Sequence, residues 1–185
     1  MFLHHYFNKE NKPFQSISDL TENEAREIWH SMAKYLIQKE GKEYNPDDFN
    51  ESFINRYKMR RQLENALRRQ FIKKGGNVSR DYPYYLILSE DEKPDKGLLD
   101  FYKNGDYIII PVKDFEMNTV SFSYGDSYAQ YYDSEFEKDK FELVYTYDEI
   151  LAVIEKYGWV KKNENNWGFV EAHIWSDEAI NRYRQ

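Results

Sequence analysis

The segment that most constrains the fold runs from residue 45 to residue 76, because both of its ends carry helix-boundary signals. It begins Asn-Pro-Asp-Asp, which combines a helix cap, a proline at the first helical position and two acids at the positive helix end. It ends Lys-Lys-Gly-Gly, where lysines suit the negative helix end and glycine adopts a terminating left-handed conformation. Apolar residues recur between these ends at helical spacing: Phe49, Phe53, Tyr57, Leu63, Leu67 and Phe71. The pattern predicts a long amphipathic helix that reaches Lys74.

A second helix is predicted over residues 22–40. Thr21 and Glu24 match a capping box, and Leu20 and Ala25 are placed as the hydrophobic staple that accompanies it. Gly41 is a natural helix stop. The two helices would form an N-terminal helical pair.

After Pro83 the sequence changes to short strand patterns separated by turn residues. Thr146 and Glu149 form another capping box, which predicts a helix that ends at Gly158. Residues 128–142 match neither pattern, and residues 163–166 read as a polar loop. Strands are predicted at 2–7, 84–89, 106–112, 119–124 and 169–175. Because strands and helices do not alternate, we predict an α+β fold: an N-terminal helical pair packed against a mostly antiparallel sheet, with one further helix near the C-terminus.

Length and composition favour one cytoplasmic domain. The 185 residues suit a single domain, with a helical part at about 18–76 and a sheet-rich part at 77–185 that strand 2–7 could join. The chain has no cysteine, which excludes disulfides, thiolate zinc sites and cysteine nucleophiles and fits a reducing compartment. The sequence also shows neither a signal peptide nor an apolar run of about 18 residues, so no membrane segment is expected.

Charge is distributed unevenly along the chain. The net charge is -7, which disfavours general nucleic-acid binding, yet residues 56–80 hold nine basic residues and one acid, Glu64. This window carries +8 and the remainder therefore -15. Such a row could hold phosphate or carboxylate groups through arginine. The alternative, which is more frequent, is a solvated helix face that pairs with the acids of the same protein.

Seven residues are candidate ligand contacts. Arg60 and Arg61 lie in the basic row, and Arg80 precedes the tyrosine-rich strand 84–89, so these arginines could bind and stack on a planar anion. Asp126 lies in a glycine turn after the strand 119–124, which is a common position for functional groups. Each group also has a purely structural interpretation. Arg80 and the tyrosines could form a contact between two layers of the fold, with Arg80 paired to a carboxylate, and Asp126 and Ser127 could simply stabilise the turn through bonds to its backbone. The candidates are Arg60, Arg61, Arg80, Tyr82, Tyr84, Tyr124 and Asp126.

The four histidines do not define a metal site. His4 and His5 are adjacent in a predicted strand and should point to opposite faces, whereas His173 and Glu171 should share a face. A core or surface role is more frequent for each of them and for His30. We assign no metal or cofactor, since phosphate-loop, dinucleotide-binding and nucleophile-elbow spacings are all missing from the sequence.

Five segments in this order resemble a family of uncharacterised bacterial proteins over nearly the whole chain. They read LHHYF (3–7), RRQLE to FIKKGG (60–76), YPYYLIL (82–88), SFSYGDS (121–127) and YTYDEI (145–150). The resemblance implies a bacterial cytosolic setting and a shared fold, and no activity or site residue.

Three functions follow as hypotheses, and whether the protein is an enzyme stays open. The first is a small cytosolic bacterial binding or regulatory protein for a protein partner or an anionic small molecule, because arginine and aromatic residues dominate binding surfaces. The alternative is an enzyme for a phosphorylated or nucleotide-like substrate, which requires Arg80, Tyr124 and Asp126 in one cleft. The third is an acidic nucleic-acid mimic or inhibitor.

Overall fold

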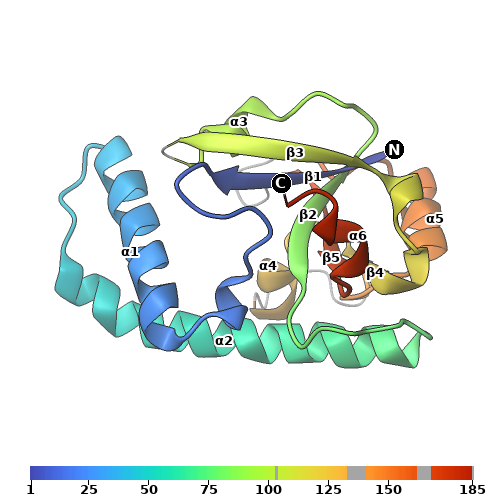
Figure 1. The fold of residues 1–185 in the computed structure, drawn as a ribbon, viewed down its shortest axis with the longest axis horizontal. Helices are drawn as coiled ribbons and strands as arrows, with labels where there is room; N and C mark the ends of the chain where they lie inside the picture. The colour runs from blue at the N-terminus through green and yellow to red at the C-terminus, as the bar shows by residue number, and fades with distance from the viewer. Residues whose placement is uncertain (103, 133–140, 162–167, 185) are drawn as a thin grey trace.

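The protein has the α+β fold that the sequence predicts: a five-stranded antiparallel sheet with an N-terminal helical pair and a further helix near the C-terminus (Figure 1). A computed structural model describes residues 1–102, 104–132, 141–161 and 168–184. The predicted polar loop at 163–166 lies outside these ranges.

The helical pair consists of α1 (Glu22–Lys39) and α2 (Pro46–Lys73). Both bonds of the predicted capping box form at the start of α1, and the Asn45 side chain accepts a hydrogen bond from the Asp47 N–H at the start of α2. Beyond the end of α2, Gly75 has a φ of 86°, which is the left-handed conformation that glycine favours. Figure 1 shows α2 running along one side of the molecule, with α1 rising from one end of it.

The sheet has the strand order β3-β1-β2-β5-β4, and every neighbouring pair is antiparallel. The N-terminal strand therefore lies inside the sheet, between two strands that follow the helical pair in the sequence. Pro111 ends the edge strand β3, where its missing N–H costs no ladder bond. The bounds are β1 Phe2–Asn8, β2 Tyr84–Ser89, β3 Gly105–Pro111, β4 Val120–Ser123 and β5 Val170–Ile174.

One face of the sheet carries the main apolar core. Leu86 of β2 lies opposite Ala172 of β5, and Phe122 of β4 lies opposite the same alanine, so their side chains share one face. Ile150 of α5 (Tyr147–Tyr157) and Ile180 of α6 (Glu178–Asn181) belong to this fully buried cluster. Burial of this face accounts for the alternating pattern of the strands.

The opposite face of the sheet is polar although it is covered. Ser121, His173 and Glu64 of α2 have no exposed surface, and the Arg60 guanidinium of α2 lies 4.3 Å from the ring centroid of Tyr85 on β2. Buried polar groups must find partners, so this face requires a hydrogen-bond network.

Two short helices complete the chain. The helix α3 (Lys96–Leu99) lies between β2 and β3, and α4 (Ser127–Tyr132) occupies part of the segment for which the sequence predicts neither helix nor strand. Asp126 explains α4, because its Oδ1 accepts hydrogen bonds from the Tyr128 N–H at 2.8 Å and the Ala129 N–H at 3.3 Å. The residue expected in a simple turn therefore begins a helix.

Candidate functional site

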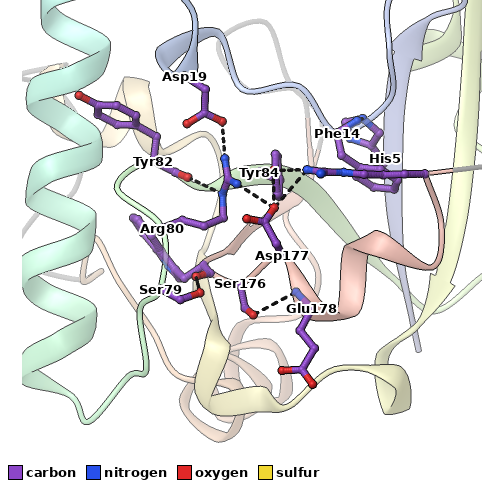
Figure 2. A network of polar contacts seen from close by, with 12 residues as sticks. His5, Phe14, Asp19, Ser79, Arg80, Tyr82, Tyr84, Ser176, Asp177 and Glu178 are labelled. Atoms are coloured by element: carbon purple, nitrogen blue, oxygen red, sulfur yellow. Dashed lines mark hydrogen bonds and ion pairs between the residues drawn. The ribbon is translucent and has the colours of Figure 1, made fainter.

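Arg80 lies at the centre of a polar cluster that joins distant parts of the chain (Figure 2). Its Nη1 donates to Asp177 at 2.8 Å, its Nη2 to Asp19, and its Nε to the Tyr82 carbonyl oxygen at 3.0 Å. The guanidinium also stacks on Tyr84, 3.8 Å from the ring centroid. All three nitrogens therefore have partners within the protein.

The neighbours of Arg80 are also satisfied by one another. The Tyr84 hydroxyl donates to Asp177 at 2.7 Å, and Arg184 contacts both. Burial, followed by the bond to Asp177, raises the pKa of Tyr84 to about 12. Burial alone would raise the pKa of Asp177, but the bonds from Tyr84 and Arg80 hold it below its usual value. This cluster binds the C-terminal segment to β2.

The seven candidate residues fall into separate places. Arg61, Arg80 and Tyr82 line one groove of about 420 Å³, in which the Arg61 guanidinium lies 4.8 Å from the Tyr82 ring centroid. Asp126 lines a cavity on the polar face of the sheet, and Tyr124 donates a hydrogen bond to the Gly158 carbonyl at 2.8 Å. The structure therefore does not bring Arg80 and Asp126 into one cavity.

A second cavity, of about 380 Å³, lies between α1, the N-terminal loop and the sheet. Arg60 and the candidate Tyr84 line it together with further aromatic side chains, among them Tyr6, Tyr85, Phe101 and Tyr102. A smaller chamber of about 230 Å³ is lined by the same four aromatic residues and by Asp126 and Glu171. We call the two together the aromatic cavity, and distinguish its Arg60 chamber from its acidic chamber.

Arg60 is held rigidly in its chamber. Its Nε donates to Glu64 at 3.1 Å, and its guanidinium stacks on Tyr85. Glu64 is fully buried, whereas the Arg60 side chain remains 28% exposed because it lines the cavity. Burial raises the pKa of Glu64, and Arg60 offsets this effect only in part. Burial would lower the pKa of Arg60, but Tyr85 and Glu64 raise it, so the guanidinium stays charged.

The two carboxyl groups of the acidic chamber have different environments. Burial and then the charge of Glu171 raise the pKa of Asp126. Burial would also raise the pKa of Glu171, but bonds from His173 and from the Ser127 N–H, at 3.1 Å each, lower it below the usual value. At neutral pH the chamber therefore holds one firmly ionised carboxylate and one that accepts a proton more readily.

A chain of hydrogen bonds from Trp175 through Ser121 and His173 fixes the orientation of Glu171. The Trp175 indole N–H can only donate, and it donates to the Ser121 oxygen at 2.9 Å. The Ser121 hydroxyl then donates to His173 Nδ1 at 3.2 Å, which leaves Nε2–H to donate to Glu171. The chain fixes the tautomer of the buried imidazole and the orientation of the carboxylate.

Sequence patterns indicated only part of this cavity. Arg60 and Asp126 were candidates, and Glu171 and His173 were expected on one strand face, whereas Tyr85 and Tyr102 were not singled out. Alternation along β2 could have indicated Tyr85, because a strand that presents Tyr84 to one face presents Tyr85 to the other. Within the described residues, no three histidine or acidic side chains are grouped as metal ligands would be.

Comparisons with known proteins identify no relative: no family model, curated protein or solved structure matches this chain. In the ranges that the structure describes, no helix has the length and apolar character needed to cross a membrane.

Proposed function

We propose that the protein is a cytosolic binding or regulatory protein whose aromatic cavity takes a small, flat organic molecule bearing a carboxylate or phosphate group. Arg60 would bind that group, and the four aromatic residues would contact the ring. The Arg60 chamber, at about 380 Å³, is within the range of small-molecule pockets, which are mostly apolar with a few fixed polar groups.

The environment of Arg60 carries this proposal. Within the described part of the chain it donates a hydrogen bond through Nε alone, to Glu64. The two terminal nitrogens, which form the fork that matches a carboxylate or phosphate, have no such bond there. Because Tyr85 and Glu64 already hold the side chain, little conformational entropy would be lost on binding. Arg80 differs, since its own protein occupies all three nitrogens.

Calorimetric titration with aromatic acids tests the proposal. Benzoate, 3-phenylpropionate and phenyl phosphate are suitable probes, and Arg60→Lys keeps the charge while removing the fork. We expect Arg60→Lys to weaken binding about tenfold, because a bidentate contact becomes a single one. The matched control is Arg61→Lys, because Arg61 lines the groove that contains Arg80 and does not line the Arg60 chamber. Equal weakening by the two variants, or binding unaffected by Arg60→Lys, would contradict the proposal.

Catalysis on a phosphorylated substrate in the same cavity is the second candidate. It is favoured by the two carboxyl groups of the acidic chamber, whose pKa values are shifted in opposite directions, as in many acid–base pairs. Hydrolysis of p-nitrophenyl phosphate that disappears in Glu171→Gln but persists in Asp148→Asn, an exposed site, would support it. Absence of turnover by a protein that binds phenyl phosphate would count against it.

A further inference from the structure

The side chains that line the aromatic cavity carry more acidic than basic groups, which disfavours a ligand whose only charged group is anionic. Three carboxyl groups, those of Glu64, Glu171 and Asp126, lie within electrostatic reach of the Arg60 guanidinium. Glu64 is already the hydrogen-bonded partner of Arg60, and Glu171 accepts a hydrogen bond from His173, whereas Asp126 has no ion-pair partner among the described residues. A ligand that brings a positive charge as well would correct this imbalance.

Building on the proposed function, we propose that the ligand is zwitterionic: its anionic group binds Arg60, and an ammonium group of the same molecule binds in the acidic chamber, against Asp126 and Glu171. The two chambers are adjacent, because Tyr6, Tyr85, Phe101 and Tyr102 line both of them, and the proposed ligand would lie along these shared side chains. A ring-bearing amino acid has the required groups, with its two charges only a few bonds apart.

The acidic chamber provides oxygen acceptors for an ammonium group. Glu171 uses Oε2 for both of its hydrogen bonds, and Asp126 uses Oδ1 for both of its own. Among the described residues, the second oxygen of each carboxylate, Oε1 of Glu171 and Oδ2 of Asp126, accepts no hydrogen bond. An ammonium group has three donors and no acceptor, which suits these oxygens.

The chamber walls also suit a cation. Aromatic ring faces attract ammonium groups, and Tyr6, Tyr85, Phe101 and Tyr102 surround the two acids. The Tyr85 hydroxyl is a further observation: it is buried and lies beside Glu64, but it has no hydrogen bond of normal geometry. Glu64 is within reach as an acceptor for this hydroxyl proton, and the hydroxyl oxygen can accept a hydrogen bond from a bound ammonium group.

Three matched probes separate the contributions of the two charges. L-phenylalanine carries both charges, 3-phenylpropionate only the anion, and phenethylamine only the cation. We expect L-phenylalanine to bind the full chain at least about tenfold more tightly than either single-charge probe in calorimetry. Asp126→Asn should remove most of this advantage, and the variant should fold, because asparagine also caps helices well.

Charge-matched controls make the outcome specific. Asp148→Asn removes the same charge from an exposed position at the start of α5 and should leave all three affinities unchanged. If 3-phenylpropionate binds as tightly as L-phenylalanine, and Asp126→Asn alters neither, the zwitterion proposal is overturned while the Arg60 proposal stands. If phenethylamine binds as tightly as L-phenylalanine and Arg60→Lys has no effect, both proposals fail. Absence of binding by all three probes refutes the zwitterion proposal, and the Arg60 proposal fails with it if benzoate and phenyl phosphate do not bind either.

Discussion

The stability of the protein should fall in mild acid, and protonation of His5 should make a large contribution to that loss. His5 is 8% exposed, and its ring stacks on Phe14 with centroids 4.4 Å apart. Its Nε2 accepts a hydrogen bond from the Phe14 N–H at 2.9 Å, and its Nδ1 faces the Tyr85 carbonyl oxygen at 3.3 Å. Because Nε2 must accept, the proton resides on Nδ1 and the neutral imidazole is satisfied at both nitrogens.

Protonation would disrupt this arrangement, and its free-energy cost can be worked out. Burial lowers the pKa of His5 from 6.5 to about 4. The pKa of this histidine in the unfolded state is 6.5, so above that pH its neutral form contributes fully to stability. The contribution is lost as the pH falls from 6.5 through the folded-state pKa of about 4. The full loss is about 3 kcal/mol, since each pKa unit corresponds to roughly 1.4 kcal/mol. About 2 kcal/mol of it should already be lost between pH 7 and pH 5.

Urea unfolding of the native protein and of His5→Gln measures this effect. The glutamine amide can still accept a hydrogen bond but does not titrate, so the variant should lose about 2 kcal/mol less than the native protein between pH 7 and pH 5. Every carboxyl group titrates in both proteins and cancels in the comparison. Parallel stability profiles for the two proteins over this pH range would refute the reasoning, as would an NMR titration that shows His5 charged at pH 6.

Three further changes test the packing around the two sites. Arg80→Ala should lower the free energy of unfolding by about 1–3 kcal/mol in urea titrations, less than a fully buried ion pair because its carboxylate partners are partly exposed. Trp175→Phe should cost about 1–3 kcal/mol, because it removes the N–H that donates to buried Ser121, and thermal unfolding would show this. Gly76→Ala should lower the melting temperature, since a Cβ at this position would overlap the Phe71 ring; an unchanged melting temperature would contradict this expectation.

Local signals were sufficient to predict most of the fold. Asn45 and Pro46 mark the start of α2, and the capping box at Thr21 marks the start of α1, because each acts within one helical turn. The strands were predicted for the same reason, since side-chain alternation requires no knowledge of partners. The helix α4 was not predicted, because Ser127–Tyr132 lacks apolar periodicity and depends on the cap from Asp126.

The candidate site was less predictable because long-range pairing creates it. Arg60 was visible in the basic row, but its contact with Tyr85 joins α2 to a strand in another part of the chain. Asp126 meets Glu171 only because β4 pairs with β5, and no local pattern specifies that strand order. Arg80 belongs to the same basic stretch as Arg60, but it contacts Tyr84, the residue before Tyr85 in β2. Adjacent residues of a strand point to opposite faces of the sheet, so the two arginines have different surroundings.

The comparison of Arg60 with Arg80 shows how similar chemistry can have different consequences. Each guanidinium stacks on a tyrosine of β2 and pairs with a carboxylate. Arg80 is 11% exposed, and the protein itself satisfies its nitrogens, so its contribution is to stability. Arg60 is 28% exposed towards a cavity and is bonded at Nε to a buried acid whose pKa is raised. A buried arginine–acid pair adds little net stability compared with apolar residues of similar size. The position of this pair beside the aromatic cavity therefore supports the ligand binding that we propose for Arg60.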